Sequence, residues 1–207
     1  MIGGPSTTGN PGGAARDERD ARDDGDDGGA GALLLPPELL HPIEEPFDVE
    51  PLAAPRVSPG FVARLGAPPG GNGTSGAPRP ATALHAAALL DAVFGAVALL
   101  DGHDLAGVVV GRRCLAPAGL DLGLTGVLFD IDGVQVGTAA GAASAGGHPA
   151  AAVAQAVTAA ERRGDRVTPA SAVWCGPLLD PVALPPGARS VRASFAHLGD
   201  VPLRVRR

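Results

Sequence analysis

Pro55-Arg56-Val57-Ser58-Pro59-Gly60-Phe61 is the stretch that says most about this chain, and it contains no acidic side chain. A hard cation such as Mg²⁺ needs anionic oxygen ligands, because it gives up its hydration water reluctantly. Neither the Ser58 hydroxyl nor Gly60 supplies such a ligand. The stretch therefore argues against a metal site at these two positions.

Low-complexity sequence lies on both sides of this stretch. Residues 1–30 combine Gly, Pro, Ser and Thr with a run of mixed charges from Arg16 to Asp27, and they contain almost nothing to bury. We therefore expect residues 1–30 to be a disordered, acidic, Gly-rich leader. Residues 67–80 include the run from Gly70 to Gly76, and we expect them to form a flexible loop. The folded domain is then expected to span residues 31–207.

Hydrophobic periodicity predicts the helices and strands of this domain. Helical spacing favours a helix over Thr82–Phe94, stopped by Gly95, and an alanine-rich helix over Pro149–Arg163, ended by Gly164. Asp132-Gly133 tolerates the positive φ of a tight turn, so a hairpin is expected around it. The predicted strands are Ala96–Leu100, Val108–Val110, Leu124–Phe129, Val134–Thr138, Val173–Cys175, Ser190–Phe195 and Val201–Val205. The pattern indicates an α+β fold with a predominantly antiparallel sheet.

The composition predicts a core made of small side chains. The chain has 31 Gly and 21 Pro, and only 3% of its residues are aromatic, so Ala, Val and Leu must fill the interior. Such side chains bury little area each, and at about 25 cal/mol per Å² of apolar surface the stability margin is expected to be thin. Burial between subunits would add to this margin, which favours a homo-oligomer.

Charge and residue types exclude several classes of function. The chain contains no lysine, which excludes Schiff-base chemistry, and its net charge of -6 gives no reason to expect nucleic acid. Cys114 and Cys175 lack CxxC spacing and are interpreted as small buried hydrophobes. The apolar stretch Leu84–Leu100 is interrupted by polar residues and glycine, so no membrane span is expected. With no signal peptide indicated, we expect a cytoplasmic protein.

A series of landmarks in the C-terminal half resembles, in the same order, the 2-keto-4-pentenoate hydratase family of the fumarylacetoacetate hydrolase superfamily. The landmarks are Gly119–Leu122, Asp132-Gly133, Gly141–Ala143, Gly147–Pro149 with the helix that follows, Gly176, Gly187 and Ala193–Gly199. The resemblance implies a β-rich mixed roll or barrel-like sheet of the fumarylacetoacetate hydrolase C-terminal type, with a few helices. Residues 31–207 would then form a truncated hydratase-like domain.

In that family a divalent metal, held by three glutamates, clamps the 2-oxo group and the carboxylate of the substrate. The resemblance places these glutamates at Ser58, Gly60 and Ala98, which are all neutral. A substrate-contacting Gly-Ser-Leu-Thr segment resembles Gly176-Pro177-Leu178-Leu179, so Gly176 and Leu179 are weak candidates for substrate binding. The family's loop after the third ligand strand is reduced here to residues 104–106. No metal cofactor is expected at the family's positions.

Three polar residues near the third ligand position could replace the missing ligands. Asp101, His103 and Asp104 could hold a divalent ion such as Mg²⁺, Mn²⁺ or Zn²⁺, since the 101–103 spacing puts two side chains on one face of a strand. The alternative interpretation is that Asp101-Gly102 is a turn and that its neighbours are solvated. The acidic residues between Glu44 and Glu50 are interpreted as a surface loop. His85, His148 and His197 are each interpreted as structural or exposed rather than catalytic.

Two hypotheses follow. In the first, the chain is a homologue of the hydratases that has lost its metal site and catalysis and acts as a non-catalytic or partner subunit, with itself or with an intact homologue. In the second, it is an active hydratase or decarboxylase of 2-hydroxy-dienoates in aromatic meta-cleavage degradation, using Mg²⁺ or Mn²⁺ at rebuilt ligands. The sequence leaves open whether the chain is an enzyme and assigns no catalytic residue.

Overall fold

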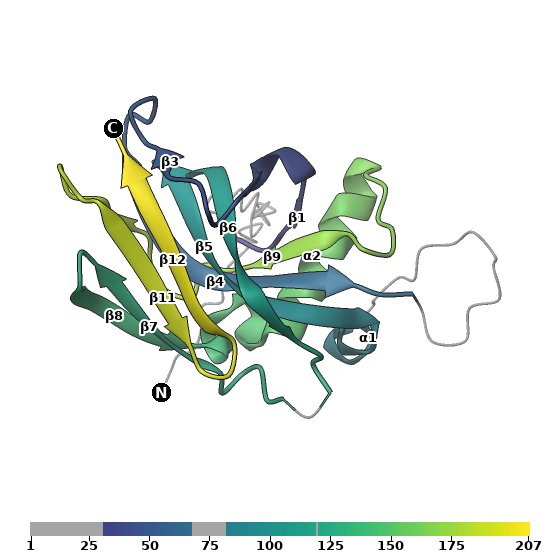
Figure 1. The fold of residues 1–207 in the computed structure, drawn as a ribbon. Coiled ribbons are helices and arrows are strands. Elements are labelled where there is room, and N and C mark those ends of the chain that lie inside the picture. The colour runs from purple at the N-terminus through teal and green to yellow at the C-terminus, as the bar shows by residue number, and fades with distance from the viewer. Residues whose placement is uncertain (1–30, 68–81, 119) are drawn as a thin grey trace, which may run out of the picture.

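The computed structural model describes residues 31–67, 82–118 and 120–207 (Figure 1). The predicted disorder of residues 1–30, and the predicted flexible loop except for Ala67, lie outside the described residues. Within the described part the protein has two sheets and two α-helices, so the α+β fold class is confirmed.

The larger sheet is built around three long neighbouring strands. Its order is β1-β9-β4-β5-β6-β2, and β10 pairs with β4 outside this path. Every pairing in it is antiparallel except that of β2 with β6. The strands are β1 (Leu33–Leu35), β2 (Leu40–His41), β4 (Pro55–Leu65), β5 (Leu90–Asp101), β6 (Asp104–Leu115), β9 (Ala172–Cys175) and β10 (Val182–Ala183).

The larger sheet curls on itself. β1 and β2 stand at its opposite ends, yet only residues 36–39 separate them in the chain, three of which form the short helix η1 (Pro37–Leu39). The two ends of the sheet must therefore approach each other, as Figure 1 shows for β1 and β6. The result is a half-closed barrel whose inner face is lined by alternate residues of each strand.

The smaller sheet has the order β3-β12-β11-β7-β8. Its strands are β3 (Phe47–Asp48), β7 (Gly126–Ile131), β8 (Val134–Ala140), β11 (Ser190–Phe195) and β12 (Gly199–Arg206). The predicted hairpin joins β7 to β8, and Asp132 and Gly133 turn the chain with φ of 49° and 79°. Two consecutive positive φ values are typical of the hairpin turn whose twist matches the flanking strands.

The helix α2 (Pro149–Arg163) has the predicted limits. The Nδ1 atom of His148 accepts a hydrogen bond from the backbone N–H of Ala150 at 3.1 Å, which caps the first turn. At the other end Gly164 has a φ of 83° and closes the helix in the left-handed conformation. Two one-turn helices, η2 (Gly141–Ala143) and η3 (Ala145–Gly147), lead from β8 into α2.

The prediction for the first helix was wrong at its C-terminal end. The helix α1 (Ala83–Leu89) begins after Thr82, whose hydroxyl accepts a hydrogen bond from the backbone N–H of His85, and the chain continues as β5 from Leu90. Gly95 does not stop the helix but lies within the strand, where a Cβ would stand 2.4 Å from the ring of Phe195. Pairing with β4 and β6 outweighs the helical spacing of the apolar residues.

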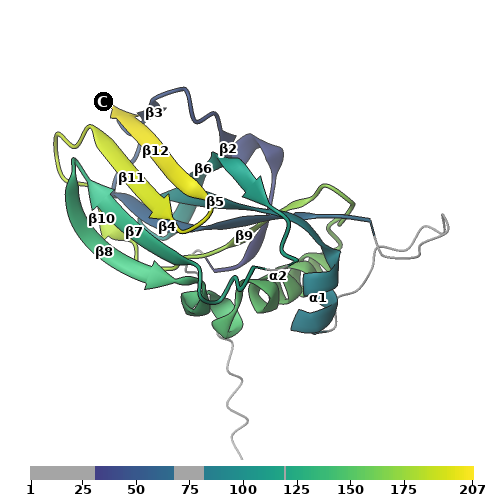
Figure 2. The ribbon, with the colours of Figure 1, turned by 60° about the horizontal axis from the view of Figure 1, so that its bottom comes forward.

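The main core lies outside the barrel, between the large sheet, the small sheet and α2. It contains buried side chains of β4 and β5, the inward residues of β7, β11 and β12, and one face of α2. The two α-helices lie next to each other along this side of the molecule (Figure 2). No helix in the described residues is long and apolar enough to cross a membrane. Cys175 is buried as predicted, but Cys114 is exposed, so its interpretation as a buried hydrophobe was wrong.

Candidate functional site

The three positions at which the family resemblance places metal ligands lie together on the inner face of the barrel. Ser58 and Gly60 alternate along β4 and point to the same side. Ser58 is paired with Ala98 across β4 and β5, and Gly60 is paired with Ala96. All four residues are buried. The three positions therefore lie at one place in the fold, although they belong to two different strands.

The indole ring of Trp174 occupies this place. Trp174 lies on β9 and is completely buried. A Cβ atom added to Gly60 would stand 2.3 Å from its ring, and a Cβ added to Gly176 would stand at the same distance from another atom of the ring. Contacts this short do not occur between real atoms, so both positions must be glycine while the indole lies here. Sequence reasoning did not identify Trp174 as a residue of this site.

Apolar side chains fill the rest of the barrel interior. The cluster around the indole comprises Leu35, Val62, Ala96, Ala98, Leu100, Val108 and Trp174, with Leu33, Leu105, Val110 and Ala172 packed against it. All of these residues belong to strands of the large sheet, so the sheet buries this cluster by curling around it. We call these residues, together with Ser58 and Gly60, the inner cluster. Ser58 carries its only hydroxyl.

The hydroxyl of Ser58 is used within the protein. Its Oγ donates a hydrogen bond of 2.7 Å to the carbonyl oxygen of Leu179 and lies 3.3 Å from the carbonyl oxygen of Pro59. The backbone N–H of Leu178 donates to the same carbonyl of Pro59 at 2.9 Å. These bonds fasten β4 to the segment that follows β9, which is a structural role.

The residues at the three positions do not fit a divalent cation. Together they offer one neutral hydroxyl, which is already committed to Leu179, and no carboxylate. A hard cation requires several oxygen ligands, of which some are anionic. The space beside Gly60 is also filled by the ring of Trp174. The lack of anionic ligands and the packing of the indole therefore both argue against a metal ion at this place.

The two weak candidates for substrate contact lie in the segment after β9. Gly176 precedes Pro177 through a cis peptide bond and packs under the indole. The carbonyl oxygen of Leu179 accepts the hydrogen bond from Ser58. Its side chain packs against Gly137 on β8, so closely that a Cβ added to Gly137 would stand 2.9 Å from the Cδ1 atom of Leu179. Neither residue presents a hydrogen-bond donor to a cavity in the way that the family's hydroxyls would.

The three candidate replacement ligands lie at the turn between β5 and β6. β5 ends at Asp101, and Gly102 has a φ of 64°, so Asp101 and His103 are not on one face of a strand and that premise was wrong. The turn interpretation is the one observed. The carboxylate of Asp101 accepts a hydrogen bond of 2.7 Å from the backbone N–H of Ala54, and Asp104 begins β6. Residues 104–106 thus belong to a strand rather than to a shortened loop.

No metal-binding group is formed elsewhere in the part of the chain that the structure describes. Within residues 31–67, 82–118 and 120–207, no three His, Cys, Asp or Glu side chains gather closely enough to hold an ion. In the acidic segment Glu44 pairs with Arg112 at 2.5 Å and Asp48 pairs with Arg206 at 3.1 Å. Hydrogen bonds from backbone N–H groups, and then those from the two arginines, lower the pKa of both carboxyls. These carboxylates fasten the surface segment to neighbouring strands.

The buried cysteine is not arranged as a nucleophile. Burial raises the pKa of the Cys175 thiol to about 12, so the thiolate that would attack a substrate is absent at neutral pH. Among the histidines, His148 caps α2, whereas His197 lies in the turn between β11 and β12 with a φ of 66°. His85 is exposed on α1.

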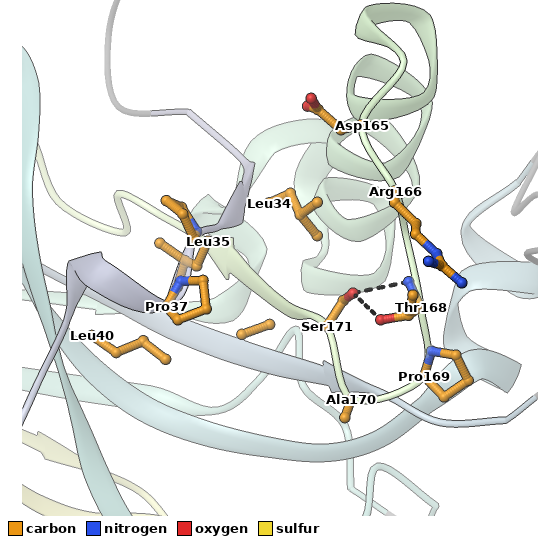
Figure 3. Close-up of a pocket in the computed structure, with 12 residues that line it drawn as sticks. Leu34, Leu35, Pro37, Leu40, Asp165, Arg166, Thr168, Pro169, Ala170 and Ser171 are labelled. Atoms are coloured by element: carbon orange, nitrogen blue, oxygen red, sulfur yellow. Dashed lines mark hydrogen bonds between the residues drawn. The ribbon is translucent and has the colours of Figure 1, made fainter.

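Two open cavities lie at the ends of the large sheet. One, of about 570 Å³, is lined by residues of β1, η1 and the segment 165–172 (Figure 3). Its hydroxyls are engaged with each other, since the Ser171 Oγ accepts from the backbone N–H of Thr168 and lies 3.2 Å from that residue's hydroxyl. Asp165 is paired with Arg163 outside the cavity. Arg166 also lines the cavity but its side chain points away from that of Asp165 (Figure 3), so these polar groups do not converge on a common point.

The second cavity, of about 440 Å³, opens at the mouth of the barrel next to the inner cluster. Its lining is mainly apolar and includes Val62, Phe94 and Val110. The two ionisable residues at its rim already have partners, because Arg64 is bound to Asp91 at 2.5 Å and His41 lies 3.2 Å from the carbonyl of Glu45. This cavity supplies surface for contact but no chemical group for catalysis.

Comparison with known proteins identifies the fold. No family model and no curated protein matches the sequence. Among solved structures, 4-oxalocrotonate decarboxylase from Pseudomonas putida G7 complexed with calcium and acetate has a TM-score of 0.69 and 22% identity, over 82% of this chain and 66% of that one. The same decarboxylase complexed with magnesium and adipate gives a TM-score of 0.68 and 21% identity, over 82% of this chain and 67% of that one.

A third neighbour is more distant in sequence. Fumarylpyruvate hydrolase from Pseudomonas aeruginosa in complex with Mn²⁺ and pyruvate has a TM-score of 0.58 and 11% identity, over 82% of this chain and 76% of that one. The present chain thus spans about two thirds of the length of the decarboxylase. These neighbours are members of the fumarylacetoacetate hydrolase superfamily, and the chain has the α+β, half-barrel fold of that superfamily's C-terminal type.

Proposed function

We propose that this chain is a non-catalytic relative of the hydratase and decarboxylase enzymes, in which the metal site has been replaced by hydrophobic packing. The observation that carries the proposal is the contact between Trp174 and Gly60. An acidic side chain at position 60 and the indole at its present place exclude each other, because even a single added Cβ would lie 2.3 Å from the ring. The protein holds the indole.

The energetics of the inner cluster support the same proposal. Carboxylates in a dry interior are costly unless a cation or hydrogen bonds compensate them. Ser58 and Ala98 are completely buried, and neither brings a charge that would need a cation. The packing of these residues therefore contains no charge that calls for a compensating ion.

The function left to such a chain is association. A protomer with a defective site still offers the surfaces through which related subunits assemble. We therefore propose a role as a partner subunit, with further copies of itself or with an intact homologue, in the cytoplasm. The neighbours that bind calcium, magnesium or manganese supply the fold for this proposal, and the reaction of 4-oxalocrotonate decarboxylase is not carried over to this chain.

Calorimetric titration with Mg²⁺ and Mn²⁺ tests the proposal, with and without oxalate as a mimic of a 2-oxo acid. The expected result is no saturable heat with either metal at millimolar concentration. Saturable binding that oxalate strengthens would contradict the proposal and would support an active, metal-dependent enzyme with rebuilt ligands. In that case Asp101→Ala and Asp104→Ala variants are the first to compare, because they would remove the binding if those residues are the ligands.

A further inference from the structure

The strands at the edges of the two sheets differ in length. Each sheet has two ends in its strand order, and three of these four edge strands are short, with three residues in β1, two in β2 and two in β3. The fourth, β8, has seven residues. Short edge strands are one of the ways in which proteins avoid pairing with another chain. β8 lacks this protection.

β8 also lacks most of the other features that block pairing. Residues 134–140 contain no charged side chain and no proline. Among the described residues β8 pairs only with β7, and Figures 1 and 2 both show it at the margin of the molecule. The register slips once, opposite Phe129 and Asp130, whereas the segment from Gly137 to Ala140 keeps regular spacing. An uncharged stretch of regular strand is therefore left with one open edge.

Exposed apolar side chains accompany this edge. Val134 is 67% exposed, Leu128 on β7 is 49% exposed and Val136 is 40% exposed. The nearest charged residue of β7, Asp130, is already paired with Arg192 at 3.3 Å. β8 itself therefore presents an apolar surface without charged side chains in a chain whose net charge is -6. It is the kind of surface on which two identical chains meet without repulsion between like charges.

We propose that the occupant of this edge is a second copy of the chain, with β8 paired antiparallel to β8 of its partner. Antiparallel pairing of identical strands follows from a two-fold axis, which is the commonest symmetry of homodimers. The small residues Gly137, Ala139 and Ala140 allow the two backbones to approach, and the two five-stranded sheets become one continuous sheet. The proposal does not depend on the loss of the metal site, since β8 lies in the other sheet.

Sedimentation velocity of the full chain over a range of concentrations tests the dimer. The wild-type protein is expected at twice the chain mass of 20.4 kDa. The double variant Val136→Lys with Thr138→Lys places like charges on both strands of the pair, and its dimer dissociation constant is expected to rise by at least about tenfold. The matched control is Leu84→Lys, at a residue that is 79% exposed on α1 and far from β8, and it is expected to leave the dimer unchanged.

Hydrogen exchange locates the interface. The amides of residues 134–140 are expected to exchange more slowly as protein concentration rises, in the wild type but not in the double-lysine variant. A wild-type monomer at all concentrations would overturn the proposal, and so would an oligomer that the two lysines do not weaken. Slow exchange of these amides in a monomer would also overturn it, because another part of the same chain would then cover the edge.

Discussion

The inside of the barrel and the outer edge of the small sheet use apolar residues in opposite ways. Inside, Trp174 is completely buried within the inner cluster. At the edge, Val134 and Val136 lie in the open on a strand with one free side. The first region is filled by its own side chains around the indole, whereas the second lies at the margin of the molecule. The difference teaches that one fold can lose an interior binding site and still offer a surface for association, which is the function that we propose for this chain.

Removing the indole is expected to have the largest effect. Trp174→Ala would leave a cavity in the inner cluster and should lower the free energy of unfolding by about 3–5 kcal/mol. Chemical denaturation followed by circular dichroism measures this change. The control is Leu84→Ala, at an exposed residue of α1, which should change the free energy of unfolding by no more than about 0.5 kcal/mol. Equal effects of the two substitutions would show that the indole is not packed as described.

A single methyl group at position 60 sharpens the comparison further. Gly60→Ala is expected to cost about 1–3 kcal/mol of unfolding free energy, because the added Cβ meets the indole. The cost should largely disappear in a Trp174→Leu background, since the smaller side chain leaves room, and this dependence is read from a double-mutant cycle. Gly126→Ala is the matched control, because its Cβ would meet only the carbonyl oxygen of Ala139 at 3.9 Å. A cost for Gly60→Ala that is independent of residue 174 would contradict the packing.

The Ser58 hydroxyl is expected to matter less. Ser58→Ala leaves the carbonyl of Leu179 without this donor in a buried place, and it should cost about 1–2 kcal/mol in urea unfolding. Ser194→Ala, on the small sheet, removes a half-buried hydroxyl and should change stability by less than about 0.5 kcal/mol. If Ser58→Ala were neutral, the hydroxyl would not be holding the segment after β9.

The smallest effect concerns the hairpin that carries β8. Backbone N–H groups of Arg189 and Ser190 donate to the carboxylate of Asp132 and lower its pKa. A lowered pKa contributes stability above the ordinary value of 3.8, and this contribution is lost as the pH falls through the lowered pKa. Asp132→Asn should therefore be slightly less stable than the wild type at neutral pH, and the gap should close in acid. A gap that stays constant with pH would contradict the assignment.

Local signals in the sequence were sufficient for the hairpin and for α2. Asp132-Gly133 and Gly164 adopt the positive φ values that their residue types favour, and Pro149 opens its helix as predicted. These features depend on neighbours within a few residues. The end of α1 was misjudged because β5 is held by pairing with β4 and β6, which local periodicity does not report.

The inner cluster could be predicted only in part. Ser58, Gly60 and Ala98, the positions that the resemblance singled out, lie close together on β4 and β5, and their residue types alone indicate that they carry no charge. What fills that place could not be predicted, because the contact between Gly60 and Trp174 joins strands that are far apart in the sequence. One signal was available: the only tryptophan of the chain stands two residues before Gly176, and both glycines must lack a side chain for it to fit.

The fluorescence of Trp174 tests the central claim most directly, because the chain contains no other tryptophan. We predict a blue-shifted emission that acrylamide does not quench in the native protein and that shifts to the red on unfolding. We also predict that Mn²⁺, a paramagnetic quencher, leaves the emission unchanged with or without oxalate. Emission typical of a solvated indole, or saturable quenching by Mn²⁺ that oxalate strengthens, would contradict a barrel interior that is closed by packing and does not bind metal.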